Sequence, residues 1–257
     1  LLHGGAAQVP PRLVAELGEG VLRLGEPVRA IHQNGHQSDA GTHPVRVITA
    51  AATYPCRAAI VAMPPALAAR IAFLPELHAD RQQLQQRMAM GRCAKVLVAY
   101  DTPWWREAGL SGIAIGDLAW VELGADSSDP EGGLGVLAAF VVGRRHERWA
   151  ALGEAERRAA VLGDLAAFFG PRALIPFHYE EKDWPAEPFV GGAFAAWMPP
   201  GLWTACGDAL RRPHGRVFWA GTEVAERWAG FFEGAVRSGE EAAAAVGVML
   251  SPPPPPV

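Results

Sequence analysis

Apolar and polar residues follow two different periods along this chain, and each period predicts one kind of element. Helical spacing predicts helices at residues 9–17, near 78–90, over 153–169, near 201–210 and in the final stretch before the tail. Short apolar runs between turn residues predict strands over 28–37, 43–63, 94–100, 118–123, 134–142 and 216–221. The order of these elements predicts a mixed α/β fold with antiparallel portions.

Composition narrows the class of protein. The 257 residues are 50% hydrophobic and 19% charged, with a net charge of -4, which is typical of a globular chain and disfavours a nucleic-acid partner. No apolar run is long enough to span a bilayer. Three cysteines without CxxC spacing indicate reduced thiols, so we expect a cytoplasmic protein. The chain opens with Leu1 in mid-pattern, so we expect a piece of a longer protein.

Several candidate motifs have plainer explanations. His32 and His36 have the spacing of a helical metal pair, but Asn34-Gly35 between them predicts a hairpin, so we expect no metal site. Gly133-x-Gly135-x-x-Ala138 is close to a dinucleotide fingerprint, but it leads from a turn into a strand rather than from a strand into a helix. Hydrolase elbows, Walker loops and zinc signatures do not occur in the sequence.

Lys95 lies beside the apolar run VLVAY and has two interpretations. It could extend from a strand end into water, or it could lie in a dry pocket where its charge is used. The sequence alone favours the first.

The stretch RVFWAGTEVAERWAGFFEGAVRSGEEAAAAV, residues 216–246, carries the strongest chemical signal. Thr222 and Glu223 follow a buried strand, at the edge of a sheet where ligands commonly bind. The helix that begins near Gly230 offers free N–H groups and a positive dipole end to an electron-rich ligand. Gly234 and Gly239 have the alternative interpretation that they only allow close helix packing.

This stretch resembles the carboxyl-terminal flavin-binding motif of the flavin-containing monoamine oxidase family. The segments AAIVAMPPALAARIAFLPELHADRQQ, MGRCAKVLVAYDTPWW and YEEKDWPAEPFVGGAFAAWMPPG resemble further parts of that family, as does the opening HGGAAQVPPRLVAELG with VLRLGEPVRAI. The resemblance covers residues 3–248.

The resemblance implies non-covalent FAD as the cofactor and assigns roles to individual residues. Lys95 would hold a water near flavin N5 and assist reoxidation by oxygen. The substrate pocket would include Phe140, Phe194 and Phe231. The cofactor contacts would be Val28, Trp184, Gly221, Thr222, Glu223, Gly230, Phe232, Glu233 and Ala235.

The sequence departs from the family pattern in three places. Ala193 occupies the position of a cysteine that mammalian members bind covalently to flavin, which is why we expect non-covalent binding. Phe194 and Phe231 replace two tyrosines that flank the substrate. The family's amino-terminal Gly-x-Gly-x-x-Gly is missing, so the expected fold is a two-domain amine oxidase truncated at its amino terminus. Residues 1–83 and 187–250 would form part of the FAD-binding domain and 84–186 part of an antiparallel-sheet substrate domain, with a disordered tail at 251–257.

The implied function is FAD-dependent oxidation of an amine to an imine and then an aldehyde, with O2 reduced to H2O2. One alternative is an L-amino-acid or polyamine oxidase, for which Arg106, Arg144 or Arg145 could bind a carboxylate. Another is a catalytically incomplete half that needs a partner chain. The expected partners are a small amine and O2, without nucleic acid or a membrane anchor in this chain, and the resemblance also allows a homodimer.

Overall fold

The computed structural model describes residues 5–33 and 43–251. It divides into two compact units. Unit 1 comprises Leu1–Arg87 and Pro199–Val257, and unit 2 comprises Met88–Met198. The expected domain boundaries, after residues 83 and 186, fall four and twelve residues before these divisions.

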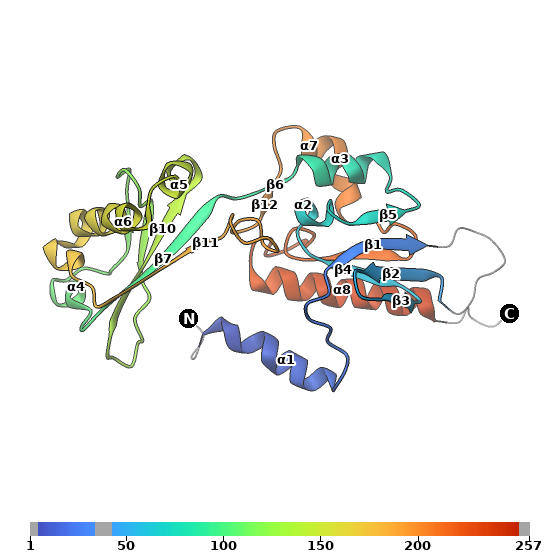
Figure 1. Ribbon diagram of the computed structural model, residues 1–257, viewed down its shortest axis with the longest axis horizontal. Coiled ribbons are helices and arrows are strands. Elements are labelled where there is room, and N and C mark those ends of the chain that lie inside the picture. The colour runs from blue at the N-terminus through green and yellow to red at the C-terminus, as the bar shows by residue number, and fades with distance from the viewer. Residues whose placement is uncertain (1–4, 34–42, 252–257) are drawn as a thin grey trace. The chain divides into compact units, whose positions relative to one another are not determined.

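Unit 1 contains two sheets and most of the helices (Figure 1). The first sheet has the order β3-β2-β1-β5, with β1 and β5 parallel and the other pairs antiparallel. The second pairs β13 with β4 in parallel. The strands are β1 (Val28–Gln33), β2 (Val45–Thr49), β3 (Thr53–Cys56), β4 (Ala59–Ala62), β5 (Ala72–Leu74) and β13 (Val217–Ala220). The helices are η1 (Ala6–Gln8), α1 (Val9–Leu17), α2 (Pro65–Ala68), α3 (Ala79–Arg87), α7 (Leu202–Cys206), η3 (Gly207–Leu210) and α8 (Phe232–Leu250).

The strand β13 and the helix α8 form the part of unit 1 that matters for the site. All four residues of β13 are buried, as expected for a parallel strand covered on both faces. The buried residues of α8 are Gly234, Ser238 and Ala242, spaced four apart on one side of the helix. Ser238 Oγ accepts a hydrogen bond of 3.0 Å from the N–H of Gly221, just after β13. The helix is therefore tied to the carboxyl end of the strand.

Unit 2 is built on a five-stranded antiparallel sheet in the order β11-β7-β10-β9-β8. A short ribbon pairs β6 with β12. The strands are β6 (Ala89–Met90), β7 (Cys93–Tyr100), β8 (Ala114–Ile115), β9 (Leu123–Asp126), β10 (Gly135–Val142), β11 (His178–Asp183) and β12 (Ala196–Trp197). The helices are α4 (Trp104–Glu107), α5 (Gly143–Ala150), α6 (Glu154–Phe169) and η2 (Pro171–Leu174).

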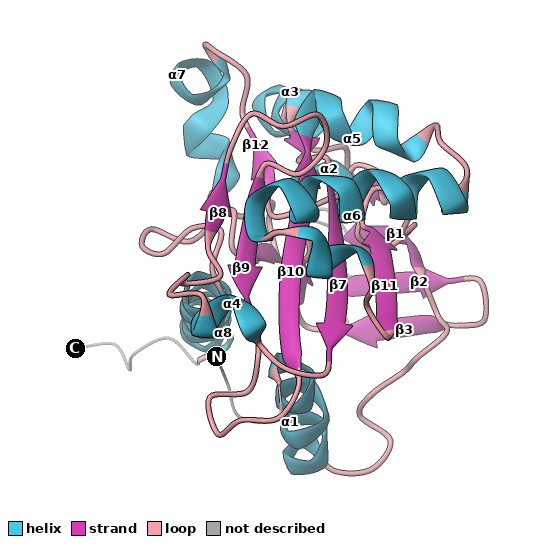
Figure 2. Ribbon diagram, turned by 90° about the vertical axis from the view of Figure 1, so that its left-hand side faces the viewer, coloured by secondary structure: helices cyan, strands magenta, loops and turns pink. Residues whose placement is uncertain are grey.

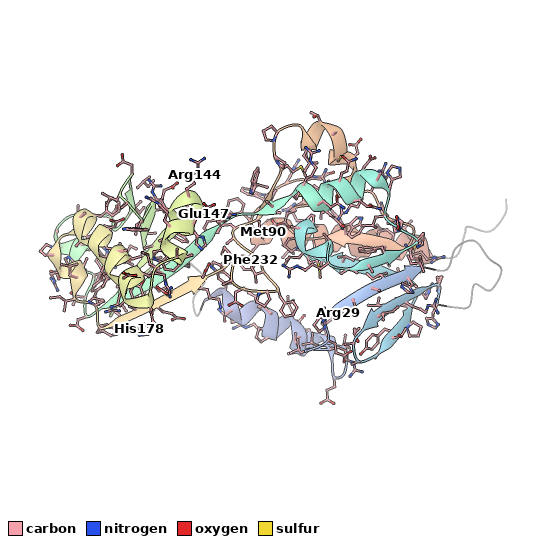
Figure 3. The ribbon with its side chains drawn as sticks, turned by 45° about the horizontal axis from the view of Figure 1, so that its top comes forward. Arg29, Met90, Arg144, Glu147, His178 and Phe232 are labelled. Atoms are coloured by element: carbon pink, nitrogen blue, oxygen red, sulfur yellow. The ribbon has the colours of Figure 1, made fainter. Side chains whose placement is uncertain are left out.

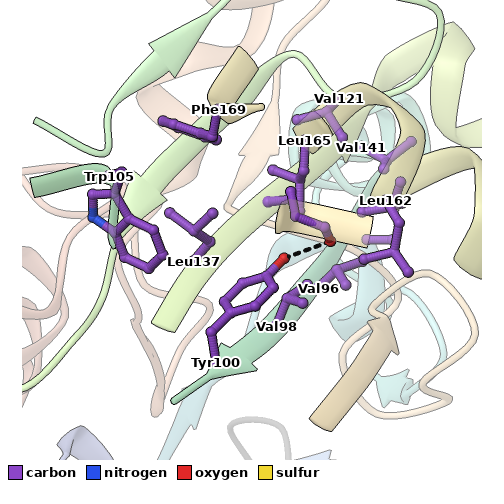
Figure 4. Close-up of a cluster of buried hydrophobic side chains, with 14 of the residues drawn as sticks. Val96, Val98, Tyr100, Trp105, Val121, Leu137, Val141, Leu162, Leu165 and Phe169 are labelled. Carbon is purple, nitrogen blue, oxygen red and sulfur yellow. Dashed lines mark hydrogen bonds between the residues drawn. The ribbon is translucent and has the colours of Figure 1, made fainter. Parts of the chain in front are cut away.

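The core of unit 2 lies between one face of this sheet and the helices. Alternate residues of β7 and β10 point to opposite faces. Val96, Val98, Leu137 and Val141 point toward α6, which lies across the strands (Figure 2), and they are fully buried. Figure 4 shows their contacts with Leu162 and Leu165 of that helix. The other face of the sheet carries the alternating residues of β7 and β10, among them Lys95 and Phe140.

The structure confirms the predicted mixed α/β fold class, and it differs from the sequence pattern in detail. The run 118–122 is not a strand, since β9 begins only at Leu123. This segment is instead a loop, in which Asp164 accepts the N–H groups of Trp120 and Val121, both at 2.8 Å. The predicted hairpin at Asn34-Gly35, together with His36 and the prolines of the tail, lies outside the described residues.

Asp126 is a carboxylate whose pKa is lowered in the folded protein, and this yields a stability prediction. Burial acts to raise its pKa, but hydrogen bonds from Arg106, Ser128 and Trp105 outweigh it and hold the pKa at about 2. The ionised form is thus stabilised in the folded state, with a contribution present above pH ~4 and lost as the pH falls toward 2.

We expect Asp126→Asn to lower the free energy of unfolding by about 2 kcal/mol at pH 7. Urea denaturation at several pH values measures this loss. The gap between the two proteins should narrow as the pH falls from about 4 toward 2. Asp129→Asn, in an exposed turn where Asp129 accepts the N–H of Glu131, is the control and should cost less. An equal difference in the free energy of unfolding at pH 7 and at pH 2 would contradict a stabilising role of the ionised Asp126.

Candidate functional site

The face of the unit 2 sheet opposite the core carries Lys95 and Phe140. The two residues are directly opposite each other on β7 and β10. Lys95 Nζ lies 5.6 Å from the centre of the Phe140 ring, and both residues are half-buried. Lys95 therefore lies within a strand, flanked by an aromatic ring, and does not extend from a strand end. The functional role of Lys95 stays a prediction.

Phe194 completes an aromatic group on this part of unit 2. Its ring centre is 5.6 Å from that of Phe140, with an angle of 50° between the planes. Phe194 is 68% exposed. Two hydrophobic faces beside an amino group can bind an apolar organic molecule and orient it toward a polar atom.

A close contact between backbone segments holds Phe194 in place. The N–H of Ala193 donates to the carbonyl of Gly91 at 2.9 Å, and the N–H of Gly91 donates to Ala195 at 3.3 Å. A Cβ on Gly91 would lie 2.1 Å from the carbonyl oxygen of Ala193, and one on Gly192 would lie 2.3 Å from that of Gly91. Only glycine fits at both positions. Sequence reasoning missed both residues, although the pair Gly191-Gly192 was a visible signal.

Trp184 follows the last residue of β11 and is half-buried. Its N–H donates to the carbonyl of Cys93 at 3.3 Å, so it is joined to the start of the strand that carries Lys95. Lys182 Nζ lies 5.8 Å from the Trp184 ring centre and pairs with Glu187. The structure thus places Trp184 just after β11, beside the start of the strand that carries Lys95.

Gly221 and Thr222 lie where β13 ends in unit 1. Gly221 has a φ of 127°, which favours glycine. Thr222 Oγ1 accepts the N–H of Gly230 at 2.6 Å and donates to the carbonyl of Phe231 at 3.1 Å. From the sequence we predicted that this hydroxyl contacts a ligand. In the structure its two hydrogen bonds close the loop before α8. Glu223 lies beside Gly221, with Oε2 3.5 Å from where a Cβ of Gly221 would be.

The helix α8 begins at Phe232, two residues later than the sequence indicated. Gly230 has a φ of 86°, and nothing lies within 4 Å of the position its Cβ would take. Ala235 already donates its N–H to the carbonyl of Phe231, at 3.2 Å, so this group is not available to a ligand. Glu233, in the first turn, accepts a 2.6 Å hydrogen bond from Arg237. The N–H groups of Phe232, Glu233 and Gly234, at the start of α8, have no carbonyl partner four residues earlier within the helix, and such groups point along the axis out of its amino end.

Exposed aromatic residues surround the start of α8. Trp228, Phe231 and Phe232 are 60%, 65% and 72% exposed. The Trp228 and Phe231 rings meet edge to face with centres 6.3 Å apart. A Cβ on Gly234 would lie 2.3 Å from the carbonyl oxygen of Trp228, so close packing explains this glycine, while Gly239 has nothing within 4 Å. Sequence reasoning did not single out Trp228.

These features fit a large, flat, partly anionic ligand such as FAD. Unit 1 contains the positive end of α8, a glycine at the carboxyl end of β13 and exposed aromatic rings at the start of α8. Val28 opens β1 in the same unit and is half-buried. Phe231 belongs to unit 1 and Phe194 to unit 2, so their joint role as flanks of a substrate stays a prediction.

The three arginines considered for a substrate carboxylate have other positions. Arg106 pairs with Asp126 at 2.7 Å, and Arg145 pairs with Glu122 at 2.5 Å. Arg144 extends outward from the first turn of α5 (Figure 3). None of the three lies on the strands that carry Lys95 and Phe140.

Residues 5–33 and 43–251 contain no group of three or more His, Cys, Asp or Glu side chains placed to hold a metal ion. In the same residues, every helix is too short or too polar to cross a membrane. All three cysteines are free.

Comparison with known proteins identifies the family of this chain. The profile of flavin-containing amine oxidoreductases matches residues 1–247. An L-amino acid dehydrogenase of Synechocystis sp. is 56% identical over 96% of this chain and 50% of its own length. Amine oxidase [flavin-containing] A of Equus caballus is 37% identical over 93% of this chain and 45% of its own length.

Among solved structures, cyclohexylamine oxidase from Brevibacterium oxydans superposes with a TM-score of 0.89 and 36% identity, covering 96% of this chain and 53% of that one. The chain belongs to the family of flavin-containing amine oxidoreductases. It spans about half the length of the relatives that it matches.

Proposed function

We propose that this chain forms part of an enzyme that oxidises the carbon–nitrogen bond of an amine with non-covalently bound FAD. The observation that carries the proposal is the placement of Lys95, Phe140 and Phe194 together on the open side of the unit 2 sheet. FAD supplies the hydride acceptor for such a reaction. The protein supplies binding, orientation and the exclusion of water.

Particular residues of this chain would do that work. The first turn of α8, with Gly221 and Gly230, would hold the cofactor through backbone groups and leave it room. Phe140 and Phe194 would hold the apolar part of the substrate and exclude water from it. Lys95 would keep a positive charge and a hydrogen-bond donor at the same place. Phe231 would add an aromatic face from unit 1.

The substrate has a second candidate, an L-amino acid. The 56% identity to an L-amino acid dehydrogenase favours it, and that relative's name also favours an electron acceptor other than O2. On the other side, Arg106 and Arg145 are already paired with carboxylates. An amino-acid substrate would therefore need a carboxylate partner other than these two.

The first experiment is a visible absorption spectrum of the purified chain, recorded before and after adding FAD and again after gel filtration. The family's Gly-x-Gly-x-x-Gly segment is missing from this sequence, so we expect little flavin to elute with this chain alone. A colourless protein would support the alternative of an incomplete half that needs a partner chain. A flavin band that elutes with the protein would contradict that alternative and would mean that the residues named here hold the cofactor unaided. Riboflavin, which lacks the phosphates and the adenosine, is the control ligand.

Non-covalent attachment has its own test. Ala193 carries no nucleophile, so precipitation of the flavin-loaded protein with acid should leave all of the flavin in the supernatant. Absorbance of the pellet and the supernatant measures the partition. A yellow pellet would contradict non-covalent binding.

A panel of cyclohexylamine, putrescine, benzylamine and L-amino acids would then separate the substrate candidates. Each compound is assayed with O2 and, in parallel, with an artificial electron acceptor. Turnover of amines with release of H2O2 would support an oxidase. Turnover of L-amino acids with the artificial acceptor alone would support a dehydrogenase.

A further inference from the structure

The face of the unit 2 sheet opposite the core carries a second lysine besides Lys95. Lys182 is directly opposite Lys95 in the antiparallel pairing of β11 with β7, two strands that lie side by side in Figure 2. Directly opposite residues project from the same face of a sheet. The sequence contains 21 arginines and only these two lysines, so both lysines of the chain lie at one place. Lys182 therefore belongs to the same surface as the proposed oxidation site.

The alternation along β11 gives the same placement. Tyr179 is half-buried and packs against the core, whereas Glu180 and Lys182 are exposed and point away from it. Trp184 is two positions after Lys182, and its N–H continues the pairing with β7 by donating to the carbonyl of Cys93 at 3.3 Å. Trp184 is therefore on the same side of the sheet as Lys182.

The amino group of Lys182 makes two contacts of different kinds. Its Nζ lies 5.8 Å from the centre of the Trp184 ring, within the range in which an aromatic face attracts a cation. The same Nζ pairs with Oε1 of Glu187. The amino group thus joins a ring and a carboxylate that belong to the loop after β11.

Backbone hydrogen bonds hold the same loop at Glu187. Its N–H donates to the carbonyl of Trp184 at 3.1 Å, and its own carbonyl accepts the N–H groups of Val190 and Gly191 at 3.0 and 2.8 Å. The chain then reaches Phe194, whose ring lies against Phe140. Glu187 is therefore at the centre of a segment that connects two predicted site aromatics.

These side-chain contacts affect the orientation of a ring more than the stability of unit 2. The side chains of Lys182 and Glu187 are 48% and 38% exposed, and an ion pair in contact with water contributes little to the free energy of unfolding. Backbone hydrogen bonds alone leave the Trp184 ring free to choose among its rotamers. A cation held beside the ring favours one of these orientations.

We propose that Lys182 is a positioning residue of the oxidation site. Glu187 holds its amino group, and the amino group holds the ring of Trp184 on the side of the sheet that carries Lys95. The importance of this for the reaction rests on the proposed function, in which Trp184 packs beside the flavin. The position of the ring itself does not depend on a bound flavin.

Fluorine NMR of the flavin-free chain, with its nine tryptophans labelled as 5-fluorotryptophan, tests the proposal. Trp184→Phe identifies the resonance of Trp184. We expect Lys182→Met to shift or broaden this resonance and to leave those of the buried Trp105 and Trp149 unchanged. Glu187→Gln, which removes the negative charge, should also move it. Lys182→Arg keeps the positive charge and should hold the resonance near its parent position.

The matched control is Glu180→Gln, which removes a carboxylate from the same strand and the same face, where it pairs with His178. This variant should leave the Trp184 resonance unchanged, and the urea midpoints of all variants should match that of the parent. If Lys182→Met does not fold, Glu187→Gln gives the same test.

A Trp184 resonance that stays in place in Lys182→Met and Glu187→Gln would overturn the proposal. An equal shift in Glu180→Gln would overturn it as well, because it would indicate a general effect of charge. So would a shift of every tryptophan resonance, which would indicate a loss of packing. If the Trp184 resonance moves as expected but the flavin-loaded protein oxidises no amine or amino acid, the proposed function fails and the placement of the ring stands.

Discussion

Replacing Gly91 by alanine is expected to lower the free energy of unfolding of unit 2 by about 3 kcal/mol. The new Cβ would lie 2.1 Å from the carbonyl oxygen of Ala193 and 3.0 Å from its carbonyl carbon. Both are backbone atoms in a hydrogen-bonded contact, so they cannot move aside as a flexible side chain would. The segment that carries Phe194 must shift or the contact must open. Urea denaturation of the parent and the variant measures the loss.

The matched control is Gly163→Ala in the same unit. Gly163 lies in the middle of α6 with nothing within 4 Å of its Cβ position, so alanine there should stabilise the helix by up to about 1 kcal/mol. Opposite signs for the two substitutions would show that the contact, rather than the loss of a glycine, decides the result. Equal small effects would mean that the two backbone segments are not held together in solution.

Replacing Lys95 by methionine is expected to slow reoxidation of the flavin-loaded protein by O2 about 100-fold, while anaerobic reduction by substrate changes little. Methionine keeps most of the side chain's length and apolar contact with Phe140 and removes the charge and the donor. Stopped-flow absorbance, with the two half-reactions followed separately, measures both rates. This prediction depends on the proposed function.

The controls for Lys95 separate charge from packing. Lys95→Arg keeps the positive charge and should retain more of the rate than Lys95→Met. Arg144→Met removes a charge from an exposed position on α5 and should leave both rates unchanged. Equal slowing of both half-reactions in Lys95→Met would contradict a specific role in reoxidation.

Elements with a clear apolar period could be predicted from the sequence. The strands β7 and β10 and the helix α6 were recognisable because their buried residues repeat every two or every three to four positions. The strand β13 was recognisable as a continuous apolar run. In each of these elements the residues buried in the structure are the apolar residues that repeat in the sequence.

Elements whose partners lie far away in the sequence were missed. The strand β11 has the sequence HYEEKD and alternates between exposed and half-buried residues, and it is held by pairing with β7 along one edge. The helix α5 buries only His146 and Trp149. Neither has enough apolar residues to be recognised locally, because tertiary contacts rather than propensity determine them.

Site residues could be predicted where the identity of the side chain points to a function. They could not be predicted where contacts between backbone atoms build the site. Lys95 and Phe140 could be named from the sequence, and in the structure they are directly opposite each other on the adjacent strands β7 and β10. The role of Gly91 against Ala193 could not, since it arises from two segments about a hundred residues apart that meet without side chains. The predicted contact of Thr222 with the cofactor stays a prediction, and the loop hydrogen bonds of its hydroxyl, to Gly230 and Phe231, could not be predicted from the sequence.

The alternation of residues along β7 has a consequence for how such a protein can diverge. Substitutions at Val96 or Val98 alter packing against α6, whereas substitutions at Lys95 or Leu97 lie on the other side of the sheet. Mutation can therefore vary the side chains available to a bound molecule without disturbing the interior that keeps the chain folded. One sheet can thus be inherited with little change by descendants that act on different compounds.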